Sequence, residues 1–169
     1  NNTNFYIAQS ICLNPFFLKK LGAGELDINY ILHILNNINE DNKDIASIVC
    51  NDSGFVNQEG YKEILNIITS VNPQNYEFVK WICKNPNFKG KNAKYISNIS
   101  KYVTQENIET VKQICQNEEY LTDKNIEQMP VRIASCSSKS GTPEWMLKCQ
   151  ELLKSENTKY AKEITEVIN

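Results

Sequence analysis

The chain has 169 residues, of which 41% are apolar and 22% are charged, and its formal net charge is −2. This length and apolar content suffice for one domain that folds without a partner. The small net charge excludes binding to nucleic acid or to an anionic membrane through a uniformly basic surface. No apolar run approaches the roughly 20 residues that a membrane-spanning helix needs, so we expect no association with a membrane.

The N-terminus has neither a signal-peptide pattern nor an initiator Met, which indicates a trimmed or processed start. The six cysteines are spaced singly along the chain rather than in close pairs. A chain of this size and apolar content does not need disulfides in order to fold. We therefore expect reduced thiols and a cytoplasmic protein.

Five of the cysteines recur with a period of about 32–38 residues, within the range of helical repeats, and they are Cys12, Cys50, Cys83, Cys115 and Cys149. Apolar residues stand one and four positions before most of them, and a second set, apolar except for Ser137, stands nineteen, sixteen and twelve positions before the last four. Offsets of three and four positions share one face of a helix, so each interval predicts two helices. In chain order, the predicted helices cover residues 4–13, 26–38, 40–50, 58–71, 73–84, 92–103, 105–116, 123–136, 143–154 and 157–168.

Residues at fixed distances from the cysteines predict how the chain turns. Eleven positions before the cysteine stand typical N-cap residues, namely Asn1, Asn39, Asn72 and Thr104. Two positions after it stand side chains that tolerate the left-handed conformation ending many helices, namely Asn14, Asp52, Asn85 and Asn117. Five positions after it stand aromatic side chains that we expect to fold back as apolar anchors, namely Phe17, Phe55, Phe88 and Tyr120.

This succession of paired helices resembles the α-solenoid class of stacked helical hairpins, and its architecture is similar to HEAT or tetratricopeptide repeats. The resemblance implies an all-α fold, namely a right-handed α-solenoid of about five hairpins and about ten helices with a period of about 32–38 residues. It also implies a single domain over residues 1–169. The expected repeats cover residues 1–38, 39–71, 72–103, 104–137 and 138–169.

The sequence predicts no catalytic, cofactor or metal site. Zinc sites usually contain closely paired cysteines, whereas even the nearest two here, Cys136 and Cys149, are much further apart in the sequence. The single histidine, His33, cannot serve as the base for five equivalent cysteines. We therefore expect a non-enzyme whose repeated cysteines are small buried apolar residues. Cys136 lies in a polar stretch and is the cysteine that we expect to be exposed.

An asparagine stands eight positions before the cysteine in four units, and these residues are Asn4, Asn42, Asn75 and Asn107. If the residue three positions earlier is the N-cap, this side chain can bond back to it, as in a capping box. The alternative resembles armadillo repeats, in which an asparagine ladder holds the backbone of an extended peptide. Both interpretations stay open, so Asn42, Asn75 and Asn107 are candidate partner-binding residues.

Residues 80–101 contain six lysines and no acidic residue, whereas each of the flanking stretches 40–63 and 102–128 contains six acidic residues and two lysines. Four of these lysines cluster around one predicted turn, and they are Lys84, Lys89, Lys91 and Lys94. Such a cluster can contact phosphate groups or an acidic peptide. The absence of arginine from this band argues against bidentate recognition of a base or a phosphate.

Three functional hypotheses follow from these patterns. The first is a non-catalytic scaffold that binds a protein or peptide along a curved helical surface, as the resemblance implies. The second is binding of RNA, or of another acidic partner, through the lysine band at 80–101. The third is a structural spacer within a larger repeat protein. We expect a monomer with no cofactor in each case.

Overall fold

The computed structural model describes residues 2–17, 28–57, 60–117 and 121–137. The regular structure within these ranges is helical and includes no strand, which confirms the predicted all-α class. The chain divides into two compact units, Asn1–Lys101 and Tyr102–Asn169. The predicted helices at 143–154 and 157–168 lie outside the described residues.

The first unit contains helices close to the positions that the apolar spacing predicts. Its α helices are α1 (Asn2–Leu13), α3 (Ile28–Asn36), α4 (Lys43–Asn51), α5 (Ile64–Ser70), α6 (Tyr76–Ile82) and α7 (Lys94–Ser100). Short 3-10 helices precede α5 and α7, and they are η1 (Tyr61–Glu63), η2 (Pro86–Phe88) and η3 (Gly90–Asn92). Helices α5 and α7 are shorter than predicted because 3-10 turns occupy their first residues.

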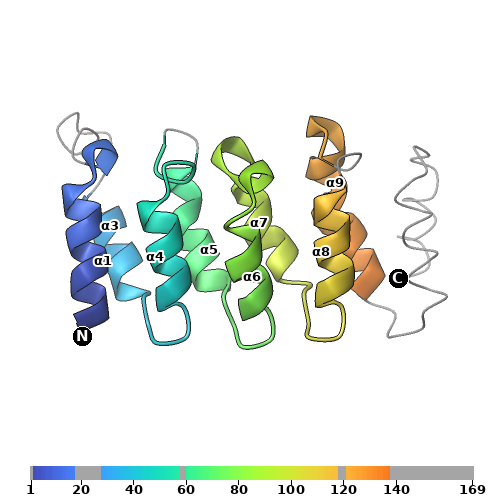
Figure 1. The fold of residues 1–169 in the computed structure, drawn as a ribbon, viewed down its shortest axis with the longest axis horizontal. Coiled ribbons are helices and arrows are strands. Elements are labelled where there is room, and N and C mark those ends of the chain that lie inside the picture. The colour runs from blue at the N-terminus through green and yellow to red at the C-terminus, as the bar shows by residue number, and fades with distance from the viewer. Residues whose placement is uncertain (1, 18–27, 58–59, 118–120, 138–169) are drawn as a thin grey trace. The chain divides into compact units, whose positions relative to one another are not determined.

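The helices of the first unit form two layers (Figure 1). In one layer α4 packs between α1 and α6, and in the other α5 packs between α3 and α7. Each helix of the first layer also packs against the helix that follows it in sequence, so α1 pairs with α3, α4 with α5, and α6 with α7.

The core between these layers consists of the apolar residues at the predicted spacing. The isoleucines nineteen and sixteen positions before each cysteine are buried, and they are Ile31, Ile34, Ile64, Ile67, Ile96 and Ile99. The residues one position before the cysteines are buried as well, namely Ile11, Val49 and Ile82 in this unit. The aromatic anchors Phe17, Phe55 and Phe88 are all 0% exposed, which confirms that they fold back into the core. The fourth anchor, Tyr120, lies outside the described residues.

The helix ends after the cysteines differ from the prediction. Asp52 and Asn85 have extended backbones, with φ near −92° and −79°, and no described residue other than glycine has a positive φ. Their side chains instead accept a hydrogen bond from the N–H two positions later, at Gly54 (2.8 Å) and Asn87 (3.0 Å). The predicted left-handed conformation is therefore wrong, because these residues cap the next turn rather than end the preceding helix.

The described part of the second unit consists of α8 (Ile108–Gln116) and α9 (Asp123–Ser137), close to the predicted helices at 105–116 and 123–136. The Cys115 thiol of α8 contacts the Met129 sulfur of α9 at 3.7 Å. Pro130 lies within α9, where it has no N–H to continue the helical hydrogen bonds. No helix in the described ranges is long and apolar enough to cross a membrane.

Candidate functional site

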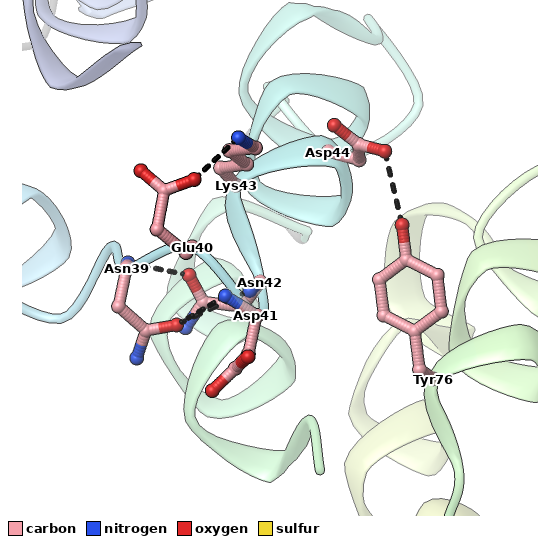
Figure 2. A network of polar contacts seen from close by, with 7 residues as sticks. All are labelled: Asn39, Glu40, Asp41, Asn42, Lys43, Asp44 and Tyr76. Carbon is pink, nitrogen blue, oxygen red and sulfur yellow. Dashed lines mark hydrogen bonds and ion pairs between the residues drawn. The ribbon is translucent and has the colours of Figure 1, made fainter. Parts of the chain in front are cut away.

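The asparagines eight positions before the cysteines lie at the starts of helices, as the side chain of Asn42 illustrates (Figure 2). The N–H of Lys43 donates to the carbonyl of Asn39 at 3.0 Å, so helical hydrogen bonding extends back from α4 to Asn39. The Asn42 Oδ1 accepts a bond from the Asn39 N–H at 2.9 Å, and the Asn39 Oδ1 accepts one from the Asn42 N–H at 3.2 Å. This reciprocal pair satisfies helix-start donors in the manner of a capping box.

The side chains of Asn75 and Asn107 accept the same hydrogen bond as Asn42, from the backbone N–H three residues earlier. The Oδ1 of Asn75 accepts from the N–H of Asn72 at 2.9 Å, and the Oδ1 of Asn107 accepts from the N–H of Thr104 at 2.8 Å. These bonds confirm the capping interpretation of the three asparagines. The side chain of Asn4 lies outside the described part of the chain.

The amide hydrogens of these asparagines reach further than a local cap requires. Asn75 Nδ2 donates to the carbonyl of Ser70 at 2.9 Å, at the end of α5, and to the carbonyl of Ser100 at 3.0 Å, at the end of α7. Asn42 Nδ2 donates in the same way to the carbonyls of Asn37 (2.9 Å) and Ile68 (3.3 Å). We call Asn42 and Asn75 the asparagine clamps, because each joins the ends of two successive helices of the second layer.

Asn107 repeats the first of these donor bonds within the second unit, where its Nδ2 donates to the carbonyl of Tyr102 at 2.9 Å. Asn42 is 4% exposed and Asn75 is 0% exposed. Each clamp donates both hydrogens of its amide to carbonyls of this chain. These contacts favour a structural role for the asparagines, and partner binding by Asn42, Asn75 and Asn107 stays a prediction.

Two lysines of the basic band form ion pairs with the acidic stretch that precedes it. Lys89 Nζ lies 2.5 Å from Asp52 Oδ2, and both side chains are partly buried. The backbone reinforces this contact, because the N–H of Gly90 donates to the carbonyl of Gly54 at 2.7 Å. Gly90 adopts a positive φ of 59° at this point, a conformation that glycine adopts readily. Lys89 therefore joins two successive turns of the first unit.

The second ion pair joins α4 to α6. Asp44 accepts a hydrogen bond from the Tyr76 hydroxyl at 2.9 Å, drawn in Figure 2, and contacts Lys80 Nζ at 3.3 Å. These two donors, the tyrosine first, lower the pKa of the Asp44 carboxyl. The Lys80 ammonium also lies 5.3 Å from the centre of the Tyr76 ring. The three residues hold neighbouring helices of the first layer together at the surface.

The other three lysines of the cluster are exposed and lie around the connection from α6 to α7. Lys84 follows α6, Lys91 lies in η3, and Lys94 is the first residue of α7. The Lys94 ammonium is 4.9 Å from the centre of the Tyr95 ring. We call Lys84, Lys91 and Lys94 the lysine patch, and it concentrates exposed positive charge on one connection of the first unit.

Three of the repeated cysteines are buried free thiols, namely Cys50, Cys83 and Cys115. Burial raises the pKa of Cys50 and of Cys83 to about 12, and it raises the pKa of Cys115 as well. A thiol that stays protonated is a poor nucleophile and metal ligand. Within the described residues, no group of histidine, cysteine and acidic side chains could hold a metal ion.

Cys12 departs from the prediction, because it is exposed. The cysteines at the same position of later helices, Cys50 and Cys83, are both buried. Cys136 falls within α9, but its side chain and Cys149 lie outside the described residues.

Helix α3 contains two further polar side chains, His33 and Tyr30. His33 is exposed on α3, as expected for a helix surface residue. Tyr30, which the sequence analysis did not single out, donates its hydroxyl to the carbonyl of Tyr61 at 2.7 Å. Burial is the main reason that its pKa is raised to about 12. The sequence does contain a pattern that could have identified Tyr30. A tyrosine stands at the same distance before Cys115, namely Tyr95, as Tyr30 does before Cys50.

Comparison of the chain with protein-family models, curated proteins and solved structures gives no match.

Proposed function

We propose that the chain is a right-handed α-solenoid of stacked helical hairpins, with about five hairpins over its whole length. The observation that carries this proposal is the recurrence of one asparagine bond at Asn42, Asn75 and Asn107, which are almost evenly spaced in the sequence. The pairwise packing of α1 with α3, α4 with α5, and α6 with α7 supports it. Proteins of this class present extended surfaces on which equivalent helices are aligned.

The function that this arrangement supports best is a non-catalytic scaffold that binds an acidic segment of another protein at the lysine patch. Lys84, Lys91 and Lys94 are exposed. Lys80 and Lys89 also belong to the basic band, and they form ion pairs with acidic residues of the first unit. An acidic partner would meet three exposed ammonium groups on one hairpin. Charge complementarity would therefore set its docking site and speed its association.

Nucleic acid is the second candidate partner. Lysine ammonium groups contact phosphates as point charges, and RNA would therefore bind the same patch without sequence preference. The patch contains no arginine, and Arg132 is the only arginine in the chain. Arginine provides the planar fork that recognises base edges bidentately, so its absence argues against recognition of a particular nucleic-acid sequence.

The experiment that tests this proposal is a fluorescence anisotropy titration of the full chain with two labelled probes. One probe is an oligoglutamate peptide and the other is an oligouridylate of the same net charge. We expect the peptide to bind, more weakly as salt is added, and the Lys84→Glu/Lys91→Glu/Lys94→Glu variant to lose about tenfold in affinity or more. If the oligouridylate bound more tightly than the peptide, the proposed partner would be RNA instead of a protein.

The matched control reverses three lysines outside the patch, in the variant Lys43→Glu/Lys62→Glu/Lys112→Glu. Both variants change the net charge by the same amount, so a general electrostatic effect would weaken binding equally in both. An equal loss would contradict a docking site at the lysine patch. Binding of neither probe would leave the structural spacer as the better description of the chain.

A further inference from the structure

Trp81 is a half-buried side chain on α6, in the same helical pair as the lysine patch. Its ring centre lies 5.9 Å from that of Phe78, at an interplanar angle of 37°. Since Phe78 is 0% exposed, this contact holds the indole against the core. The indole N–H donates no hydrogen bond within the part of the chain that the structure describes. Trp81 therefore offers a partner both apolar surface and a hydrogen-bond donor.

The repeated pattern does not require a tryptophan at this position. Trp81 stands two positions before Cys83. The residues two positions before the other repeated cysteines are smaller and not aromatic, and they are Ser10, Ile48, Gln113 and Leu147. The tryptophan thus occurs in the helical pair that also contains the lysine patch, and the packing of helical pairs alone does not account for it.

Lys84 of the lysine patch lies one helical turn beyond Trp81. The Lys84 N–H donates to the Trp81 carbonyl at 3.1 Å, so the helical turn continues past the end of α6. Side chains three positions apart on such a turn are neighbours on one face. Because Lys84 is exposed and Trp81 is half-buried, one partner segment can contact the ammonium group and the indole together.

Glu77 stands four positions before Trp81 on α6 and is exposed, so it shares this face of the helix. The order along the face is therefore a carboxylate, the indole and an ammonium group. Glu77 repels an acidic partner, whereas Lys84 attracts it. The acidic residues of a partner should therefore lie on the Lys84 side of the indole, and an uncharged side chain should cover the indole itself.

We propose that Trp81 anchors the partner of the lysine patch, and that this partner is an acidic protein segment with a large apolar side chain beside its acidic residues. The inference rests on the proposed function, because Lys84 belongs to the lysine patch. Tryptophan is among the residues that most often dominate the binding energy of an interface. The contact with Phe78 already restricts the indole, so binding loses little side-chain freedom.

A tryptophan beside lysines can also stack on a base of single-stranded nucleic acid. Every nucleotide carries a phosphate, so a base stacked on Trp81 would bring phosphates to both sides of the indole. One of them would lie towards the Glu77 carboxylate. A peptide can place its acidic residues on the Lys84 side alone, and the charges on this face therefore favour the peptide.

The test is a fluorescence anisotropy titration of the full chain with two labelled oligoglutamate peptides of equal length. One has a central leucine and the other a central alanine. The leucine peptide should bind about tenfold more tightly, because its larger side chain is buried on the indole. In Trp81→Ala the two peptides should bind equally. The alanine peptide should bind this variant as it binds the unmodified chain, and circular dichroism establishes that the variant is folded.

Phe5→Ala is the matched control, because Phe5 is an aromatic residue of the first layer that is 65% exposed. It lies on α1, and α4 packs between α1 and α6. This variant should keep the preference for leucine. Glu77→Gln removes a repulsive charge and should raise the affinity for both peptides. A lower affinity in Glu77→Gln would contradict the placement of the acidic segment on this face.

Tryptophan fluorescence provides a second measurement that leaves the indole of α6 in place. The chain contains two tryptophans, so Trp145→Phe makes Trp81 the sole source of indole emission. Saturation with the leucine peptide should shift this emission to shorter wavelength, because the bound side chain excludes water from the indole. An emission maximum that stays constant at saturation would overturn the proposal.

The outcomes separate this inference from the proposed function. If both peptides bound the unmodified chain equally, the lysine patch would stand and the anchor at Trp81 would be overturned. If neither peptide bound, both proposals would fall. If Trp81→Ala weakened the binding of an oligouridylate but kept the preference for leucine, Trp81 would stack on a base, and the peptide anchor would be overturned.

Discussion

The side chain of Asn75 and the backbone carbonyl of Ser100, 25 residues further along the chain, are joined by a hydrogen bond of 3.0 Å. The same amide group also donates to Ser70 and accepts from Asn72. One buried side chain thereby satisfies three backbone groups at the ends of three helical segments. Such hydrogen bonds stabilise the fold mainly because a buried backbone group without a partner lowers the free energy of unfolding.

The first prediction concerns this clamp. Asn75→Ala should lower the free energy of unfolding by about 3 kcal/mol, because it leaves buried backbone groups without their partner. Asn66→Ala is the control, since Asn66 is exposed on α5, and it should change the value by less than about 0.5 kcal/mol. Urea unfolding followed by circular dichroism measures both. Equal losses in the two variants would contradict the clamp.

The second prediction concerns Gly60, which is buried before η1. A Cβ atom there would lie 2.8 Å from the Phe55 carbonyl oxygen and 3.0 Å from that of Gly54. Since both neighbours are backbone atoms, Gly60→Ala should cost about 1–3 kcal/mol of stability. The melting temperature should fall accordingly, whereas Ser47→Ala on the exposed face of α4 should leave it almost unchanged. An unaltered melting temperature for Gly60→Ala would refute this packing.

The third prediction concerns Lys89, the member of the basic cluster that is paired with Asp52. Lys89→Glu places a carboxylate beside Asp52, so it should destabilise the fold by about 1–3 kcal/mol. Lys84→Glu reverses an exposed charge and should have little effect on stability. Chemical denaturation of the two variants distinguishes them. If Lys84→Glu were the more destabilising change, the assignment of Lys89 to the fold and of Lys84 to the binding surface would be reversed.

The fourth prediction concerns alkaline pH. The pKa values of Cys50 and Cys83 are raised from 9.0 to about 12, and that of Tyr30 from 10.0 to about 12. Above pH 9 the unfolded chain releases protons that the folded chain retains, so rising pH favours unfolding. The free energy of unfolding should therefore fall between pH 9 and pH 12. The fall should be smaller in Cys50→Ala/Cys83→Ala, and a pH-independent stability would contradict the burial of these groups.

The fifth prediction concerns thiol reactivity at neutral pH. Cys12 should react rapidly with iodoacetamide in the folded chain, while Cys50, Cys83 and Cys115 should react only after unfolding, because burial both shields them and keeps them protonated. Mass spectrometry of the labelled peptides measures each site. Rapid labelling of Cys83 in the folded chain would show that α6 does not pack as described.

The positions of the core residues could be predicted from the sequence because burial on a helix follows its period of about 3.6 residues. Ile64 and Ile67, or Ile96 and Ile99, share one face by spacing alone, and all four are 0% exposed. The cap formed by Asn42 was predictable for a similar reason, since it bonds to a residue only three positions away.

The backbone conformation after each cysteine was harder to predict from the sequence, because asparagine and aspartate can either adopt the left-handed region or cap a following turn. At Asn85 the sequence itself contains a decisive signal. Pro86 follows it, and a residue before proline is driven towards an extended conformation. The observed ψ of 120° agrees with this restriction.

The long-range half of the asparagine clamp could not be predicted. Asn42 donates to Ile68 and Asn75 donates to Ser100, and neither acceptor is a side chain that a sequence pattern could identify. The exposure of Cys12 was equally unpredictable, since its sequence surroundings resemble those of the buried Cys50.

The most direct test of the repeated structure is the hydrogen exchange of the backbone amides that donate hydrogen bonds to Asn42, Asn75 and Asn107. The residues concerned are Asn39, Asn72 and Thr104, whose N–H groups donate to Asn42, Asn75 and Asn107. Amides at helix starts have no intrahelical partner and ordinarily exchange fast. We predict slow exchange at all three positions by nuclear magnetic resonance, with protection lost at Asn72 in Asn75→Ala. Exchange at the rate of an unprotected amide at these positions would contradict the account.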